Sequence, residues 1–426
     1  MTRIASLLLI ASLCALALTG CSPPDTPTDV QDAATGAGEV NIEMPGTDAP
    51  AETPTEPTTT DGPTLDQPAN TPPPADPPAE EPVEDPAEQP AVDEPAETSD
   101  GQETAGKSKL LVQLPSDYCN TPDGMVVLPD SSIIVSMPNF NDTEQPACLV
   151  KITPDNQCEK FYDLPPQPDT GQFGPLGITL APSGDLYLAD FQKDDPGKSR
   201  VVRIVMKEGK PVDMIVVASG FTVSNAVEVR GDWLYVTETQ IDTEAKPATS
   251  GILRFRIGEE GVELKQPLTD DPHFIGLIEC HDAELPLGAD GMCFDDDGNL
   301  YVSVFSDGKI FKIALDENDQ PGEPTLFAEA ECMKCADGLD YDAQRKVIYV
   351  ADSRANAIHA VTLDGQVSTI AQNGDTDGLD GGMDQPCEVR RRGNTLIVSN
   401  MDWPVPGCVN QQYNEPATLS VIELEE

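Results

Sequence analysis

The chain has 426 residues, 41 of them Pro and 33 Gly, and a formal net charge of -50 at pH 7. A chain this acidic is a poor partner for nucleic acid, so we expect no nucleic-acid-binding function. These figures average over three segments of different composition, residues 1–20, 21–106 and 107–426.

The first segment, residues 1–20, is typical of a bacterial lipoprotein signal peptide. Its apolar run is too short to span a bilayer and ends in "LTGC", which matches the order of a lipobox. We therefore expect acyl chains of the palmitate type on Cys21, each buried methylene contributing about 0.8 kcal/mol to membrane anchoring. This predicts a protein anchored to a bacterial membrane outside the cytoplasm, with the outer membrane or cell surface favoured. The alternative is an ordinary secretory signal with an incidental Cys.

The second segment, residues 21–106, is predicted to be a disordered linker. Between residues 22 and 106 there are 18 Pro, 21 Asp or Glu and no Lys or Arg. Such a composition buries no core and repels itself into an extended tether. An acidic patch that collects cations or a partner is the alternative interpretation. The remaining residues, 107–426, hold 54 acidic against 24 basic residues, a net charge of -30.

Residues 107–426 contain six copies of one pattern, two apolar runs joined by a tight polar turn. The second residues of the copies are separated by 47 to 65 positions: Asp123, Leu176, Asn225, Asp290, Asp337 and Cys387. A period near fifty with several short strands per copy predicts an all-β fold, a six-bladed β-propeller. The run "KLLVQLP" at 109–115 has no blade of its own, so we expect it to complete the last blade. We expect a monomeric propeller.

Nine cysteines fall in residues 107–426, an odd number that fits an oxidising compartment and leaves at least one free thiol. Two local disulfides are predicted, Cys148 with Cys158 and Cys387 with Cys408, because each pair brackets a loop. The pairing of Cys119, Cys280, Cys332 and Cys335 stays open.

The equivalent position of every propeller blade faces the central channel at the same height. Three carboxylates and an amide therefore converge on one axis: Asp123, Asn225, Asp290 and Asp337. Carboxylates in a narrow channel repel one another, and a hard cation with oxygen ligands relieves the repulsion. The residue types favour calcium or magnesium over zinc. The alternative is that each Asp-Gly is only a turn.

Two segments carry a family resemblance. "ADGMCFDDDGNLYVSV" at 289–304 and "SNAVEV" at 224–229 resemble motifs of the group of gluconolactonases, senescence marker protein (regucalcin) and luciferin-regenerating enzyme. The resemblance implies a six-bladed propeller with one divalent cation, usually calcium and sometimes zinc or manganese. Its ligands would be Asp123, in place of the family's longer Glu, with Asn225 and Asp290. Leu176 departs from the family, which has an oxygen-bearing residue there.

The resemblance implies a metal-dependent hydrolase of lactones or esters, with Asp290 as general base. No Gly-x-Ser-x-Gly motif suggests a serine hydrolase instead. Candidate substrate contacts are His281, Glu388 and Arg390, although a solvated loop or turn is the simpler interpretation of each. The alternative function is a non-catalytic propeller of the NHL type that binds a ligand or protein on its rim.

Four other polar residues are expected to be structural. Asp190, Glu238 and Asp352 end the second apolar run of their copies, where an acid bonds turn amides. His359 lies within an apolar run and is expected to pack there.

Overall fold

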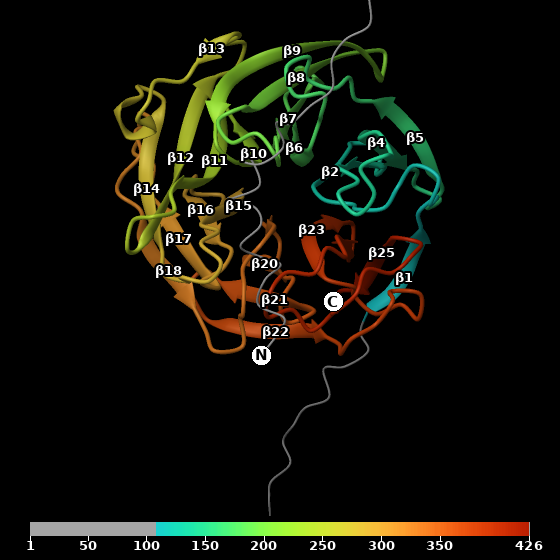
Figure 1. Cartoon of the computed structure of the whole chain (residues 1–426). Helices are drawn as coiled ribbons and strands as arrows, with labels where there is room; N and C mark the ends of the chain where they lie inside the picture. Colours follow the sequence, from blue (N-terminus) through green and yellow to red (C-terminus); the bar gives the residue numbers. More distant parts are fainter. Residues whose placement is uncertain (1–107, 426) are drawn as a thin grey trace, which may run out of the picture. The chain divides into compact units, whose positions relative to one another are not determined.

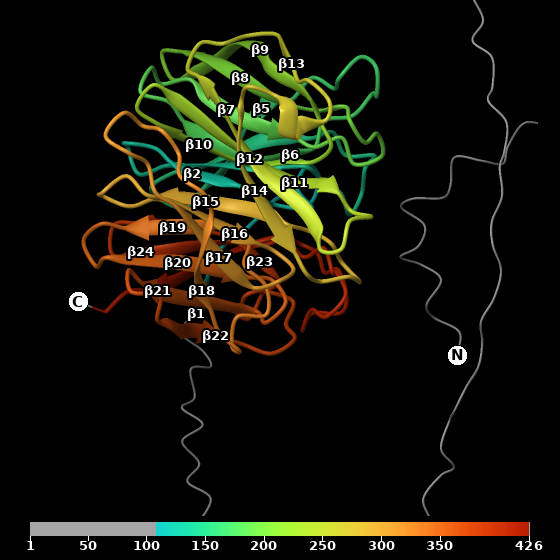
Figure 2. The same ribbon diagram turned by 90° about the vertical axis from the view of Figure 1, so that its left-hand side faces the viewer.

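The computed structural model describes residues 108–425, which form six β-sheets around a central channel (Figures 1 and 2). Apart from one 3-10 turn, η1 (Leu268–Asp270), the described regular structure is strand. The predicted all-β six-bladed propeller is therefore confirmed. The residues of the predicted signal peptide, of the predicted lipidation at Cys21 and of the predicted linker lie outside the described residues. Within residues 108–425 no helix has the length and hydropathy needed to cross a membrane.

The first three blades follow the order of the chain. Blade 1 contains β2 (Met125–Val127), β3 (Ile133–Met137), β4 (Cys148–Ile152) and β5 (Cys158–Asp163). Blade 2 contains β6 (Pro175–Leu180), β7 (Leu186–Asp190), β8 (Ser199–Lys207) and β9 (Lys210–Phe221). Blade 3 contains β10 (Ser224–Arg230), β11 (Trp233–Asp242), β12 (Ala248–Arg256) and β14 (Phe274–Cys280).

The last three blades have the same antiparallel order. Blade 4 contains β15 (Ala289–Phe294), β16 (Leu300–Val304), β17 (Lys309–Ile313) and β18 (Thr325–Glu329). Blade 5 contains β19 (Leu339–Asp342), β20 (Val347–Asp352), β21 (Ala357–Thr362) and β22 (Val367–Gln372). Blade 6 contains β23 (Pro386–Arg392), β24 (Thr395–Asn400), β25 (Thr418–Glu423) and β1 (Ser108–Gln113).

An insertion explains the longest spacing of the repeat, between Asn225 and Asp290. The segment between β12 and β14 crosses to the neighbouring blade, where β13 (Val262–Glu263) pairs in parallel with β9. Blade 2 consequently has five strands, and the insertion covers its outer edge.

The last blade is closed by the N-terminal strand, as the sequence predicts. Strand β1 pairs antiparallel with β25, from Ser108 opposite Ile422 to Gln113 opposite Thr418. The amide of Leu114 continues the contact by donating to the carbonyl of Ala417 (2.9 Å). The two ends of the described chain are thus held in one sheet.

The core is divided into six apolar clusters, one between each pair of neighbouring blades. Alternate residues of a strand point to opposite faces, so each blade contributes to two clusters. In β3, for example, Val135 packs toward blade 6 and Ile134 toward blade 2. Both faces are buried at inner strands such as β3 and β16, which is why these strands are almost continuously apolar.

The structure contains no disulfide among the nine cysteines of the described residues, contrary to the two predicted pairs. Cys158 lies opposite Ile152 in the β4–β5 ladder, and Cys148 is four residues further along β4. At about 3.4 Å per residue this separates the two Cα atoms by roughly 13 Å, beyond the reach of a disulfide. It is Cys119 whose thiol lies beside both.

The second predicted pair is also separated by the fold. Cys387 lies in the channel, with its Sγ atom 3.6 Å from the carbonyl oxygen of Pro122 in blade 1. Cys408 belongs to the loop between β24 and β25. The amide of the next residue, Val409, donates to the carbonyl of Arg354 (2.9 Å), so this part of the loop lies on blade 5.

Removing β1 tests the closure of the ring. A chain that begins at Leu114 should unfold at lower urea concentration than a chain that begins at Ser108. The half-buried Leu110, Leu111 and Val112 account for about 3 kcal/mol of lost stability, at about 1 kcal/mol each. The shorter chain should also self-associate through the exposed edge of β25, which light scattering would detect. Equal unfolding midpoints would contradict the closure.

Candidate functional site

The candidate site is a ring of residues at the point where the first strand of each blade begins. Three hydroxyl groups from the preceding blades fix the backbone of this ring by donating to its carbonyl oxygens. Ser136 binds the carbonyl of Leu176 (2.7 Å), Thr237 that of Asp290 (2.9 Å) and Ser303 that of Asp337 (2.7 Å). We call the six residues at this level the upper ring: Asp123, Leu176, Asn225, Asp290, Asp337 and Cys387.

Small residues after the ring positions let neighbouring blades approach closely. A Cβ atom on Gly124 would lie 2.6 Å from the carbonyl oxygen of Leu176, and one on Gly291 would lie 2.4 Å from that of Asp337. Both distances are far below van der Waals contact, so only glycine fits without moving the next blade. The glycine of each of these Asp-Gly pairs is therefore needed for neighbouring blades to pack around the channel.

The polar members of the upper ring lie together. Asp290 lies beside Asp337 on one side and Asn225 on the other, close enough for both side chains to act on its pKa. Asp337 is oriented by Ser353, whose Oγ atom donates to Oδ2 (2.8 Å). Asn225 is oriented by Thr239, which lies 3.3 Å from its Nδ2 atom.

Asp123, the fourth predicted ligand, faces the same group from blade 1. Its backbone amide donates to the carbonyl of Ser136 (3.0 Å), which holds it at the ring level. The charge of Asp290 raises the pKa of Asp123, and the charge of Asp123 in turn raises the pKa of Asp337. The structure thus brings together all four residues that the repeat placed on one axis.

Burial and mutual repulsion make these carboxyl groups hard to ionise. Burial raises the pKa of Asp290 to about 7, the charge of Glu388 acts in the same direction, and the hydrogen bonds with Asp337 and Asn225 oppose the shift. The pKa values of Asp123 and Asp337 are also well above the ordinary range, first through burial and then through the charge of Asp290. A bound cation would relieve this cost.

A second polar layer lies three residues further along the first strands. Burial raises the pKa of Glu228 to about 7, while Arg390 opposes the shift and Asp340 adds to it. Arg390 donates from Nε to the carbonyl of Met125 (3.0 Å) and from Nη2 to Glu388 (3.1 Å). Its guanidinium therefore links blade 6 to blade 1 beneath the upper ring.

Arg390 compensates only part of the negative charge in the channel. The six carboxyl groups that surround it or lie above it belong to Asp123, Glu228, Asp290, Asp337, Asp340 and Glu388. Glu388, Asp340 and Glu228 raise the pKa of Arg390 against the effect of burial, so its charge is already engaged by the lower layer. Arg390 therefore does not compensate the negative charge that ionisation of the upper ring would create.

The donor set fits a hard cation. No three His, Cys, Asp or Glu side chains within residues 108–425 are already arranged to hold a metal ion. The group formed by Asn225, Asp290 and Asp337 combines two carboxylates with one amide. Calcium accepts such oxygen ligands together with water, and a turn of the Asp123 side chain would add a third carboxylate. The fit therefore rests on three protein ligands in mutual contact.

The predicted substrate contacts occupy different places. His281 is exposed just after β14, with Nδ1 3.1 Å from Asp307 Oδ2. Glu388 and Arg390 are paired with each other in the channel (3.1 Å). The substrate roles of these three residues stay predictions.

The residues expected to be structural have that role. Glu238 accepts the amides of Thr222 and Val223, both at 2.7 Å. Asp190 accepts the amide of Gly174 (2.9 Å) and pairs with Arg200. His359 is fully buried with Nε2 3.1 Å from Asp352 Oδ2.

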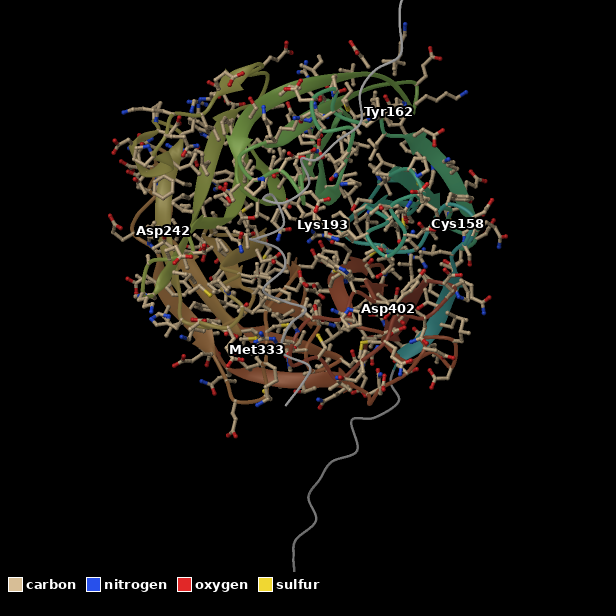
Figure 3. The ribbon with its side chains drawn as sticks, viewed as in Figure 1. Cys158, Tyr162, Lys193, Asp242, Met333 and Asp402 are labelled. Carbon is tan, nitrogen blue, oxygen red and sulfur yellow. The ribbon has the colours of Figure 1, made fainter. Side chains whose placement is uncertain are left out.

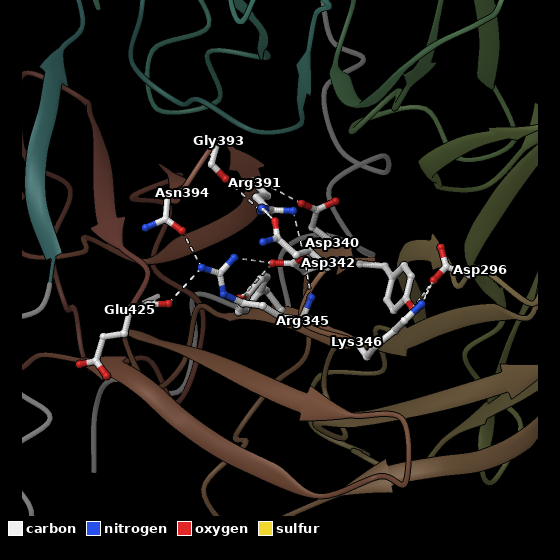
Figure 4. A network of polar contacts seen from close by, with 12 residues as sticks. Asp296, Asp340, Asp342, Arg345, Lys346, Arg391, Gly393, Asn394 and Glu425 are labelled. Atoms are coloured by element: carbon white, nitrogen blue, oxygen red, sulfur yellow. Dashed lines mark hydrogen bonds and ion pairs between the residues drawn. The ribbon is translucent and has the colours of Figure 1, made fainter.

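The far end of the channel wall is held by a network of ion pairs (Figure 4). Asp342, at the end of β19, is bound by Arg391 (2.9 Å) and Arg345 (3.1 Å), and Arg391 also donates its amide to Asp340 (2.6 Å). Figure 4 places Lys346 beside Asp296, one of the three aspartates in the 295–297 turn. The basic run at 390–392 is therefore largely engaged by the protein itself.

Sequence reasoning missed the groups that orient the ring and the lower layer. Ser353 follows the second strand of blade 5 and Thr239 lies within the second strand of blade 3, and no motif marks either residue. Glu228, Asp340 and Arg390 are each three residues after a ring position, so the repeat alignment contained a signal for the lower layer.

Comparison with known proteins gives similarity in structure only. No protein-family model matches the sequence, and no curated protein sequence matches it either. Similar solved structures include a gluconolactonase from Xanthomonas campestris, 14% identical over 75% of this chain and 89% of that one, with a TM-score of 0.48. A luciferin-regenerating enzyme is 10% identical over 74% of this chain and 94% of its own, with a TM-score of 0.49.

These structures include the two enzyme groups whose motifs the sequence resembles. A virginiamycin B lyase from Staphylococcus aureus is similar as well, 15% identical over 75% of this chain and 99% of its own, with a TM-score of 0.43. Similarity at these identities concerns the fold alone, and a fold does not determine a function.

The raised pKa values predict how stability depends on pH without metal. A carboxyl group with a raised pKa is neutral in the folded protein over a range where it ionises in the unfolded chain. Stability should therefore fall as the pH rises from about 4 to about 7 in the presence of a chelator. Asp290→Asn should recover on the order of 4 kcal/mol at pH 8, since the pKa of Asp290 rises from 3.8 to about 7 and one pKa unit corresponds to about 1.4 kcal/mol.

Urea unfolding at pH 5 and pH 8 measures this effect. The matched control is Asp297→Asn, which changes an exposed aspartate in the following turn and should leave the difference between the two pH values unchanged. If the free energy of unfolding depends on pH in the same way in wild type and Asp290→Asn, ionisation of Asp290 does not destabilise the folded protein.

Proposed function

We propose that this propeller is a divalent-cation-dependent hydrolase of lactones or esters. The observation that carries the proposal is the contact of Asn225, Asp290 and Asp337 on the channel axis. Three oxygen-bearing side chains are held there at the cost of raised carboxyl pKa values, as befits a cation site. Calcium suits this donor set best, with magnesium, manganese and zinc as alternatives.

The residues of the chain have distinct parts in this proposal. When bound, the cation would polarise a substrate carbonyl and lower the pKa of a nearby water. Asp290, with a pKa of about 7 in the metal-free channel, is the general base for that water. Ser353 and Thr239 hold Asp337 and Asn225 in position. Arg390 links blades 6 and 1 below the ring.

The cellular setting belongs to the same proposal. Lipid on Cys21 would anchor the protein to the outer membrane or cell surface, with the acidic linker at 21–106 as a tether. The enzyme would act as a monomer on a small-molecule lactone or ester outside the cytoplasm.

Hydrolysis of δ-gluconolactone and 4-nitrophenyl acetate tests the proposal. We expect turnover that a chelator abolishes and calcium restores. Asp290→Ala should lower kcat/KM by about 100-fold, the usual effect of removing a general base, whereas Asp297→Ala should leave it unchanged. Rates that are the same with chelator and with calcium would contradict the metal-dependent reaction.

A second function is favoured by a cavity of about 910 Å³. It lies among the loops of blades 4, 5 and 6 and is lined by residues that include Asp282, Leu285, Lys334, Arg354, Gly407 and Val409. A propeller that binds a ligand or partner on its rim would use such a cavity, with the cation serving only the channel. Calcium binding without turnover of either substrate would favour this function.

A further inference from the structure

One side of the channel mouth is apolar and aromatic. Leu176, the ring residue of blade 2, belongs to an apolar cluster against which Phe140 and Phe191 pack. Phe140 in turn contacts Trp403, with ring centroids 5.2 Å apart and planes at 44°. The rings of Phe140 and Phe191 meet edge to face at 6.0 Å. We call Phe140, Phe191 and Trp403 the aromatic cluster.

The aromatic cluster lies at the same end of the channel as the upper ring. Each of its members follows the second strand of a blade: β3 in blade 1, β7 in blade 2 and β24 in blade 6. Because first and second strands are antiparallel, the second strand ends where the first begins. Phe140 also lies against Gly174, two residues before Leu176, where an added Cβ atom would be 3.2 Å from its ring.

Hydrogen bonds hold the three loops together. Asn141 donates from Nδ2 to the carbonyl of Asp402 (2.9 Å), and Gln385 donates from Nε2 to the carbonyl of Trp403 (2.7 Å). The amide of Phe191 donates to the carbonyl of Gly174 (2.7 Å). Three blades thus position the rings, which remain partly exposed at the mouth.

A lysine lies over the rings. The Nζ atom of Lys193 is 4.8 Å from the ring centroid of Trp403 and 5.4 Å from that of Phe140. Figure 3 places Lys193 near the axis of the propeller. Within residues 108–425 no carboxylate forms an ion pair with Lys193, although the domain is strongly acidic. Its charge is thus available to an anion at the mouth.

The cluster faces the proposed cation ligands across the channel. In a six-bladed ring, blade 2 is opposite blade 5, so Leu176 is opposite Asp337. A molecule whose carbonyl reaches Asn225, Asp290 and Asp337 would extend its other end toward blades 6, 1 and 2. That end meets the aromatic cluster and the ammonium group of Lys193. The aromatic rings stack on planar apolar groups, and the ammonium group attracts negative charge.

We propose that the aromatic cluster and Lys193 bind a planar apolar group that carries a carboxylate, so the substrate is an anionic aryl-bearing lactone or ester. The inference rests on the proposed hydrolase function for the reacting bond. It assigns substrate specificity to residues on the side of the channel formed by blades 6, 1 and 2. On that side the ring residue Leu176 has no oxygen atom in its side chain.

Binding of a product-like probe tests this inference. In calorimetry with the full-length protein and calcium, 3-phenylpropanoate should bind and gluconate should bind at least tenfold more weakly. Trp403→Ala should raise the dissociation constant of 3-phenylpropanoate by about tenfold, as expected for loss of one aromatic contact. Trp403→Phe should retain binding, which separates a lost ring from a misfolded loop.

Two further variants complete the test. Lys193→Met should weaken the binding of 3-phenylpropanoate but not that of the neutral 3-phenylpropanamide, because the substitution removes only the positive charge of Lys193. The matched control is Trp233→Ala, which removes the other tryptophan of the chain, stacked between Arg254 and Arg256 away from the cluster. This variant should bind the probe as the wild type does.

The outcomes separate this inference from the proposed function. Equal binding by wild type and Trp403→Ala, or tighter binding of gluconate, would overturn the inference even if lactones are hydrolysed. Probe binding that depends on Trp403 and Lys193 would support it even in a protein that hydrolyses neither test substrate.

Discussion

The close approach of the six inner strands is the constraint on which the site depends. Neighbouring blades touch so closely at Gly124 and Gly291 that a Cβ atom would collide with the next carbonyl. The same approach brings the preceding side chains, Asp123 and Asp290, onto one axis. Backbone packing thus holds these carboxyl groups together against their mutual repulsion. A cation site is the natural use of that geometry, because the ring supplies oxygen atoms without additional structure.

The closure of the ring makes this constraint effective. Strand β1 pairs with β25, and an apolar cluster joins blades 6 and 1 as other clusters join the remaining neighbours. Arg390 adds a polar link between the same blades through the carbonyl of Met125. Opening the ring at this point would separate Asp123 from Asp290, so the stability of the closure and the geometry of the site are coupled.

The fold could be predicted from the sequence because each blade repeats the same hairpin pattern. The strand at 109–115 belongs to no copy of the repeat, and the last copy lacks a fourth strand, so the two could be paired. The ring residues could be predicted because equivalent positions of a repeat share one height. The disulfides could not, since loop spacing says nothing of register, and register sets Cys148 far from Cys158. The aromatic cluster was also missed, because Phe140, Phe191 and Trp403 come from three loops whose conformations the repeat does not determine.

The central claim is that a cation binds among Asn225, Asp290 and Asp337. Crystals grown with calcium, measured at a long X-ray wavelength, would locate the ion by its anomalous signal. Our account predicts a peak on the channel axis with ligand oxygens of these three residues at about 2.3–2.6 Å. A channel without such a peak at saturating calcium, with the carboxyl groups still bonded directly to one another, would contradict it.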